Sequence, residues 1–407
     1  MKRIALLHFA YPPSIGGVEL LMREHAYLLD EFGYEVTIVT GSGHEDNPNI
    51  KVKEISELQS ILSFDPKLQQ KIFAGNLDED FDQLVDLLSK KLDQTLQSEE
   101  IIIIHNMSTV SRNLAFIQAL KSYTFKHPEK KFIMYTHDHM YIGEEAVKNI
   151  DSVAHSLLER ELLTEALPNS QYVAISETFK KLLIQTMKIP RDSIHVIPNG
   201  VNIKNFLEIE DSVWDFIKKF NLLDLFPIIL APVNILQRKN LLYEIEIVAE
   251  MKKIFPHIRF IITGQISSHR STQNYYQKLV KRISELQLKD EVIFMGNNLT
   301  DSLKVEEIHD LYSISDAVFY FSKSENFGLP LLEAALNKTP IFTSDIEVFH
   351  ETLDSYGHYF DITLPPSVIA EKLTTLIHQN KPMYLHHRIR SEYSLRKILK
   401  KHLVPLL

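Results

Sequence analysis

The sequence predicts an α/β protein made of two doubly wound domains, each a parallel sheet covered by helices. Short apolar runs alternate with amphipathic segments along most of the chain, which is typical of parallel sheets. This alternation is interrupted at Pro198-Asn199-Gly200-Val201, a strong turn signal, and then begins again. The length of 407 residues also exceeds the size at which a single core stops growing.

The first half is expected to open as a β-loop-α-β unit and to continue with further strands. A helix is expected at about 18–32 because apolar residues recur there on one helical face, and Gly33 supplies a C-cap. Residues 44–100 are polar and mostly helical in pattern. The strands expected in this half are 3–10, 35–40, 100–105, 131–136, 171–176 and 194–197.

The second half repeats the same rhythm after residue 200. The strands expected there are 227–231, 259–263, 292–295, 317–321 and 340–343. The helices expected there are 240–252, 275–286, 305–313 and 331–336, with a basic helix at 383–403.

Composition and charge exclude several classes of protein. The formal charge of -9 argues against a nucleic-acid binder, and the absence of cysteine excludes disulfides and thiolate metal sites. The N-terminal apolar run is short for a signal peptide, and no run approaches the roughly 18 residues of a spanning helix. We therefore expect a soluble, cytoplasmic protein. Contact of the basic C-terminal helix with an anionic membrane surface is an open alternative.

The most informative motif lies at 324–333, after the expected strand 317–321. Glu325 and Glu333 stand eight positions apart, on either side of an Asn-Phe-Gly-Leu-Pro turn that opens a helix. Free backbone amides at a helix N-terminus bind anions and hydroxyl groups. Amides together with carboxylates suit a ligand that carries phosphates and many hydroxyls.

Four motifs in order resemble one family. They are 14–19 (SIGGVE), 196–201 (VIPNGV), 238–240 (RKN) and 325–333. With these motifs the chain resembles the retaining, nucleotide-sugar-dependent glycosyltransferases of family 4, which have the GT-B fold of two Rossmann-like domains facing a cleft. The resemblance implies an acceptor domain at 1–200, joined by the C-terminal helix 384–407, and a nucleotide-sugar-binding domain at 201–383.

The resemblance assigns the donor diphosphate to glycines and a cation. Gly16 and Gly17 would let the backbone approach the pyrophosphate, although a tight turn is the simpler alternative. Lys239 would stabilise the negative charge of the leaving group. The family's second cation, an arginine, falls on Asn234, which carries no charge. Arg238 is a candidate to replace it, although neighbouring helical positions point in different directions.

The remaining implied roles concern the donor sugar, the nucleoside and the acceptor. Glu325 would accept hydrogen bonds from the sugar, and Glu333, expected to be buried and satisfied among apolar neighbours, would hold the ribose. Further donor contacts would come from Gly264, Asn297, Asn326, Phe327, Gly328 and Leu329. The implied catalytic residues are Lys239, Glu325 and His137, and the acceptor-side residues are His105, Asn106 and Asp138.

Alternatives remain for the histidines. His137 and His139 share one strand face, so a metal site competes, but a third ligand with clear spacing is missing. His137 could equally be a hydrogen-bonded histidine that takes no part in the reaction. His105 and Asn106 could equally be a hydrogen-bonded pair in the core.

The resemblance implies a metal-independent hexosyltransferase of carbohydrate biosynthesis that needs no cofactor besides its UDP- or GDP-hexose donor. The partners implied are that nucleotide sugar and a hydroxyl acceptor, with the oligomeric state left open. Two alternatives stand beside it: a GT-B protein that has lost catalysis and acts as a binding module, and a sugar phosphorylase or epimerase on the same fold.

Overall fold

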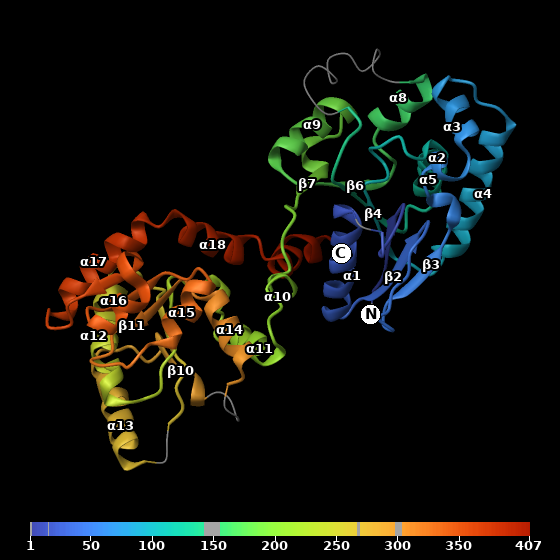
Figure 1. The fold of residues 1–407 in the computed structure, drawn as a ribbon. Coiled ribbons are helices and arrows are strands. Elements are labelled where there is room, and N and C mark those ends of the chain that lie inside the picture. The colour runs from blue at the N-terminus through green and yellow to red at the C-terminus, as the bar shows by residue number, and fades with distance from the viewer. Residues whose placement is uncertain (1, 15, 142–154, 267–268, 298–302) are drawn as a thin grey trace. The chain divides into compact units, whose positions relative to one another are not determined.

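The computed structural model describes residues 2–14, 16–141, 155–266, 269–297 (without the Asn297 side chain) and 303–407 (Figure 1). The chain divides into two compact units, Met1–Gly200 with Leu395–Leu407, and Val201–Ser394. Each unit has its own parallel sheet and its own buried core. In the part of the chain that the structure describes, no helix is long and apolar enough to cross a membrane.

The first unit contains a seven-stranded parallel sheet in the order β3-β2-β1-β4-β5-β6-β7. Its strands are β1 (Arg3–His8), β2 (Glu35–Thr40), β3 (Lys51–Glu54), β4 (Ile101–His105), β5 (Lys131–Thr136), β6 (Ser170–Ala174) and β7 (Ile194–Val196). Its described helices are α1 (Gly17–Glu31), α2 (Ile61–Phe64), α3 (Pro66–Phe73), α4 (Glu79–Thr95), α5 (Leu114–Lys126), α8 (Leu157–Thr164), α9 (Glu177–Met187) and α19 (Leu395–Ile398).

Alternating side chains of these strands pack into two different hydrophobic cores, one on each face of the sheet. Ile4 and Leu6 of β1 belong to the core that α1 covers, whereas Ala5 and Leu7 belong to the core that α4 and α5 cover. This follows from the two-residue period of a strand, and it explains why the strands read as continuous apolar runs. The C-terminal segment lies beside α1 on the first of these faces (Figure 1).

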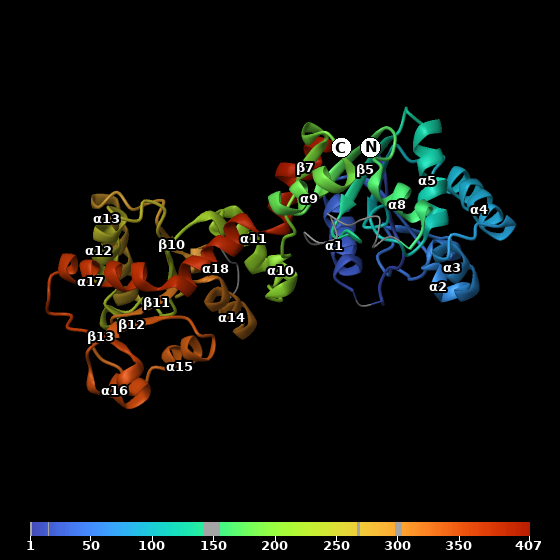
Figure 2. The ribbon, with the colours of Figure 1, turned by 90° about the horizontal axis from the view of Figure 1, so that it is seen from above.

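The second unit contains a six-stranded parallel sheet in the order β10-β9-β8-β11-β12-β13. Its strands are β8 (Ile228–Ala231), β9 (Arg259–Ile262), β10 (Val292–Phe294), β11 (Ala317–Tyr320), β12 (Ile341–Ser344) and β13 (His358–Phe360). Its described helices are α10 (Ile203–Phe206), α11 (Asp211–Lys219), α12 (Leu241–Lys252), α13 (Arg270–Glu285), α14 (Val305–Ile314), α15 (Leu329–Leu336), α16 (Glu347–Leu353), α17 (Pro366–Gln379) and α18 (Lys381–Glu392). Figure 2 shows the same elements from a second direction.

The C-terminal segment differs from the single helix expected at 383–403. Helix α18 belongs to the second unit and ends at Glu392. Two residues, Tyr393 and Ser394, then lead to α19, and Val201 donates its amide to the carbonyl of Tyr393 at 2.8 Å. Only residues 395–407 belong to the first unit. The expectation that 384–407 as a whole joins the first domain is therefore wrong for residues 384–394.

A buried ion pair explains why α18 stays with the second unit. Arg390 on α18 donates to both carboxylate oxygens of Asp316, at 2.7 and 2.8 Å, and to the carbonyl of Leu225 at 2.6 Å. Asp316 also accepts the amide of Ile228 at 2.7 Å. Burial raises the pKa of Asp316, but Arg390 outweighs it and holds that pKa below its ordinary value. The pair thus ties α18 to the amino ends of β8 and β11.

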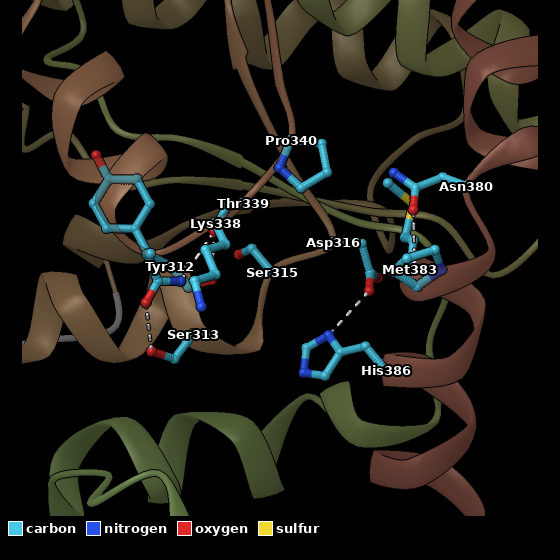
Figure 3. A pocket seen from close by; sticks show the side chains of 12 residues that line it. Tyr312, Ser313, Ser315, Asp316, Lys338, Thr339, Pro340, Asn380, Met383 and His386 are labelled. Carbon is cyan, nitrogen blue, oxygen red and sulfur yellow. Dashed lines mark hydrogen bonds and ion pairs between the residues drawn. The ribbon is translucent and has the colours of Figure 1, made fainter.

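A pocket of about 430 Å³ lies beside this pair (Figure 3). Asp316 and Pro340 precede β11 and β12, so the pocket opens at the amino edge of the sheet. His386 points toward Asp316, with their nearest nitrogen and oxygen 3.7 Å apart. None of the residues predicted to bind the donor or the acceptor lines this pocket.

The substitution Arg390→Met should destabilise the second unit strongly, because it leaves the Asp316 carboxylate buried without its partner. We expect a loss of about 3–5 kcal/mol in the free energy of unfolding. Trp214 on α11 is the only tryptophan and is buried in this unit, so its fluorescence during urea unfolding reports the change.

Arg388→Met is the matched control on the same helix. Arg388 pairs with Glu392 at an exposed position, where ion pairs contribute little. Equal urea midpoints for the two variants would contradict the assigned role of Arg390.

Candidate active site

The candidate site of the second unit lies where the direction of sheet winding reverses. Strand β8 is flanked by β9 on one side and by β11 on the other, so the strand order changes direction between β8 and β11. Ligands of doubly wound sheets bind at this point, at the carboxyl ends of the strands. The segment after β8 carries Lys239, and the segment after β11 carries Glu325.

Arg238, Lys239 and Glu325 meet there and form what we call the charge cluster. Lys239 Nζ pairs with Glu325 Oε1, and Arg238 contacts Glu325 Oε2 at 2.7 Å. Tyr320 places its hydroxyl 2.9 Å from Lys239 Nζ, and Ser322 donates to Glu325 Oε1 at 2.9 Å. The structure thus brings together three of the predicted donor-site residues.

Burial makes this cluster electrostatically strong. The side chains of Lys239 and Glu325 are only 9% and 8% exposed. Burial raises the pKa of Glu325, but hydrogen bonds from Lys239, Arg238 and Ser322 outweigh it and hold the pKa below its ordinary value. The two cations, Arg238 and Lys239, and the Glu325 carboxylate give the cluster a net charge of about +1. This charge favours an anionic ligand, because water screens it poorly.

The two neighbouring cations act on the same carboxylate, which adjacent positions of a regular helix would not permit. Residues Gln237–Lys239 form a short 3-10 turn before α12, and Asn240 follows with a positive φ of 61°. This turn directs both side chains toward Glu325. The concern that Arg238 and Lys239 point in different directions is therefore wrong. Asn234 is exposed, and no hydrogen bond or ion pair is found between its side chain and the charge cluster in the described residues.

The turn between β11 and α15 supplies amides beside the cluster. Gly328 has a φ of 100°, a conformation that other residues rarely adopt, and serves as the N-cap of α15. Asn326, Phe327 and Leu329 are exposed. Within the described chain, the amides of Asn326, Phe327 and Gly328 have no hydrogen-bond acceptor. They are therefore available to a ligand.

Glu333 is exposed, so the expectation that it is buried is wrong. It lies on α15, whose apolar neighbours Leu332 and Leu336 are themselves exposed and do not cover it. Its Oε2 accepts a hydrogen bond from Tyr312 at 2.8 Å. Glu333 lines a pocket of about 310 Å³ between α14 and α15. The other lining residues are Val305, Ile308, His309, Tyr312, Leu336 and Asn337.

Two further predicted positions have local explanations. A Cβ atom on Gly264 would lie 2.3 Å from the carbonyl oxygen of Val233, so glycine permits the close approach of the segments after β8 and β9. Asn297 ends the 3-10 turn Met295–Asn297, and its side chain lies outside the described residues.

In the first unit, Gly16 and Gly17 precede and open α1, as predicted. A Cβ atom on Gly16 would lie 2.1 Å from Glu19 Oε2, whereas one on Gly17 would meet nothing within 4 Å. The Glu19 carboxylate folds back over the helix start and lies 3.6 Å from His8 Nε2. The neighbouring His8 ring is the main cause that lowers the pKa of Glu19. A side chain at position 16 would displace the Glu19 carboxylate, which is the far end of a flexible side chain and can move aside.

The predicted acceptor-side residues have mainly structural contacts. His105 is fully buried and lies 3.2 Å from His137, between His105 Nδ1 and His137 Nε2. Asn106 accepts the amides of His137 and Asp138 at 3.0 and 2.7 Å, so it shapes the turn after β5. The burial of His105 favours the core alternative, and its contact with an acceptor stays a prediction. Asp138 is exposed, and His137 is half-buried.

The metal alternative for His137 and His139 finds no support in the described residues. Burial lowers the pKa of His137 to about 3, so this imidazole is neutral, which is the form that binds metals, and the case against a metal depends on the other ligands. Both ring nitrogens of His139 already face the backbone, at Leu163 and Tyr141. No group of three or more His, Asp or Glu side chains in the described chain is arranged to hold a metal ion.

Sequence reasoning missed Tyr320, Ser322 and Glu244, which all support the charge cluster. Tyr320 ends β11 and Ser322 follows two positions later, a spacing that the two-residue period of a strand could have revealed. Glu244 falls in the apolar stripe of α12 and is buried, with Oε1 accepting the amide of Phe321 at 2.9 Å. A lone carboxylate in such a stripe is the signal.

Several curated proteins are similar to this chain. The O-antigen chain mannosyltransferase RfbU of Salmonella typhimurium is 27% identical over 63% of this chain and 70% of that protein. The processive diacylglycerol alpha-glucosyltransferase of Acholeplasma laidlawii is 22% identical, and the match spans 63% of each chain. Mannosylglucosylglycerate synthase of Petrotoga mobilis is 24% identical over 87% of this chain and 85% of that protein.

Solved structures align over the whole chain at low identity. The glycosyltransferase from Rickettsia africae ESF-5 is 19% identical, covers 100% of this chain and 97% of its own, and has a TM-score of 0.38. Anabaena HepE in complex with UDP and glucose is 16% identical with the same coverage and a TM-score of 0.35.

Two family models match in sequence, one for each unit. The model of glycosyltransferase family 4 matches residues 15–205, and the model of glycosyl transferases group 1 matches residues 212–392. Because the two models together cover most of the sequence, this chain belongs to the group 1, family 4 glycosyltransferases, and its two parallel-sheet units are the Rossmann-like domains of the GT-B fold.

Proposed function

We propose that this protein transfers a hexose from a nucleoside diphosphate sugar to a hydroxyl acceptor, with retention at the anomeric carbon and without a metal ion. The observation that carries this proposal is the charge cluster at the switch point of the second sheet. It joins Arg238 and Lys239 to Glu325, which directly precedes the amides of Asn326, Phe327 and Gly328, unpaired within the described chain. A diphosphate needs both kinds of group, cations and fixed amide donors.

Lys239 is proposed to act on the step in which the diphosphate leaves the sugar. When the bond between the sugar and the phosphate oxygen breaks, its electron pair stays on that oxygen, so negative charge on the diphosphate grows. A buried ammonium stabilises this charge more in the transition state than in the ground state. Because Lys239 is held by Tyr320 and Glu325, little reorganisation accompanies the step.

Glu325 is proposed to bind the donor sugar. Its carboxylate is ionised and accepts three hydrogen bonds, from Lys239, Arg238 and Ser322. A sugar hydroxyl that donates to it would replace part of the contact with the exposed Arg238, which is then free to meet phosphate. The two cations and the acid thus exchange partners when the donor binds.

The nucleoside is proposed to lie beside Glu333. An ionised carboxylate accepts hydrogen bonds from two vicinal hydroxyls, as on a ribose, and Tyr312 orients this one. The adjoining pocket has mainly aliphatic and aromatic walls, which suit a flat base. UDP and GDP are both compatible with this arrangement.

For the acceptor, we propose attack from the face that the diphosphate leaves. The acceptor oxygen bonds to the anomeric carbon, and its proton passes to an oxygen of the departing diphosphate. This step keeps the configuration and balances without a further reactant. Two of the relatives named above are a mannosyltransferase and a glucosyltransferase, which supports a hexose as the transferred group.

The alternative of a binding module without catalysis loses its main support in this geometry. It depended on Asn234, which stands where the family has its second cation. Arg238 supplies a cation to the same cluster, 2.7 Å from Glu325. The count of positive charges is therefore maintained.

Lys239→Ala should lower turnover by about 100-fold or more, because the leaving group loses its buried cation. UDP- and GDP-hexoses that raise the melting temperature of the wild-type protein identify the donor. Release of UDP or GDP from that donor then measures turnover. Lys253→Ala, an exposed lysine paired with Glu250, is the control and should leave turnover unchanged. Unchanged turnover in Lys239→Ala would reject the assignment.

Asn234→Arg should change turnover by less than about threefold, since Arg238 already provides the second cation and each added charge at an exposed position is screened. The measurement is the same nucleotide-release assay. A gain of tenfold or more would instead show that Asn234 had degraded the site, as the binding-module alternative requires.

A further inference from the structure

Glu244 is a buried carboxyl group behind the charge cluster. It lies on α12, five residues after Lys239, and is fully inaccessible to solvent. The neighbouring core positions of this helix are apolar, namely Leu241, Ile245 and Val248. A carboxyl group in such a stripe is uncommon unless its charge is paired or removed.

The hydrogen bonds of Glu244 show where a proton would sit. Oε1 accepts the amide of Phe321 at 2.9 Å, whereas Oε2 has no hydrogen-bond partner among the described residues. Phe321 stands between Tyr320 and Ser322, whose hydroxyls contact Lys239 and Glu325. Glu244 therefore fixes the backbone from which two supports of the charge cluster project.

Three titratable groups of the described chain interact electrostatically with Glu244, namely Lys239 in the 3-10 turn, Tyr275 on α13 and Tyr320 on β11. Burial raises the pKa of Tyr275 to about 12 and that of Tyr320 further, so both phenols stay neutral. The charge on Glu244 is thus felt mainly by Lys239.

If Glu244 were ionised, its buried Oε2 would carry negative charge without accepting a hydrogen bond from any described residue. Such a state is costly in the protein interior, and a proton on Oε2 removes the cost. Burial accordingly raises the pKa of Glu244 to about 8, although the Phe321 amide and Lys239 oppose the shift.

We propose that Glu244 is a proton-dependent positioning residue for Lys239. With its proton in place, Glu244 holds the end of β11 without competing for the ammonium, so the positive charge of Lys239 is available to an anionic ligand. Without the proton, Glu244 becomes a second counter-charge and weakens the binding of that anion. The inference rests on the proposed function, because the anion is taken to be the donor's diphosphate.

Anion binding and proton binding must then favour each other, since linkage is reciprocal. A diphosphate next to Lys239 makes ionisation of Glu244 less favourable. Near pH 8, binding should therefore be accompanied by uptake of a proton from the buffer.

The first test needs no ligand. For an acid whose pKa is raised on folding, the folded state holds the proton while the unfolded chain has lost it. Glu244 therefore destabilises the folded state more and more as the pH rises from 4.5, the ordinary pKa of a glutamate, to about 8, its pKa in the folded protein. Glu244→Gln keeps an acceptor for Phe321 and cannot ionise. Its urea midpoint, followed by Trp214 fluorescence, should exceed that of the wild type by a margin that widens up to pH 8.

The second test measures the affinity of the nucleoside diphosphate, UDP or GDP, that binds the wild type. Calorimetry at pH 6.5–9 should show that wild-type binding weakens at least about fivefold relative to Glu244→Gln as pH rises. Comparison with the variant cancels the titration of the nucleotide itself. Repeating the titration at pH 8 in buffers of different ionisation enthalpy should show proton uptake by the wild type only.

Glu246→Gln is the matched control, two residues along the same helix, where Glu246 pairs with Arg282 at 2.9 Å. It should behave like the wild type in both tests. If nucleotides bind the wild type but the pH profiles of wild type and Glu244→Gln run parallel, the inference fails and the proposed function stands. If neither nucleotide nor inorganic pyrophosphate binds the wild type at any pH, the proposed function fails and the inference falls with it.

Discussion

The buried ion pair between Lys239 and Glu325 is the interaction on which the account of this protein depends. Two opposite charges taken out of water remain stable only when further polar groups satisfy them. Arg238, Tyr320 and Ser322 provide those groups here. They come together because β8 and β11 are hydrogen-bonded neighbours, with Leu230 opposite Val318, so the segments that follow both strands meet at one edge. The sheet order thus creates the site.

The second unit uses a buried ion pair at each edge of its sheet, for different purposes. At the amino edge, Asp316 and Arg390 bond to each other and to backbone groups, and only Arg390 Nε lacks a partner among the described residues. This pair fixes α18 to the sheet. At the carboxyl edge, Arg238 stays half-exposed and the turn amides stay open. The proposed function gives the second pair a different purpose, in which it exchanges partners with a ligand.

The sequence predicted most strands to within two residues, because strands buried on both faces read as apolar runs. It missed β3, whose residues Lys51–Glu54 are mostly charged, and β13, a three-residue edge strand, since edge strands carry little of that pattern. It found Lys239, Arg238 and Glu325, but not that one carboxylate would join both cations. The exposure of Glu333 and the break after α18 depend on tertiary packing, which local patterns do not contain.

The most direct measurement of the central claim is a crystal structure of the protein with the nucleoside diphosphate that it binds. The account predicts phosphate oxygens within hydrogen-bond distance of Lys239 Nζ and of the amides after Glu325, with Arg238 moved from the carboxylate toward phosphate. A nucleotide bound elsewhere, with the Lys239–Glu325 pair still closed by Arg238, would contradict it.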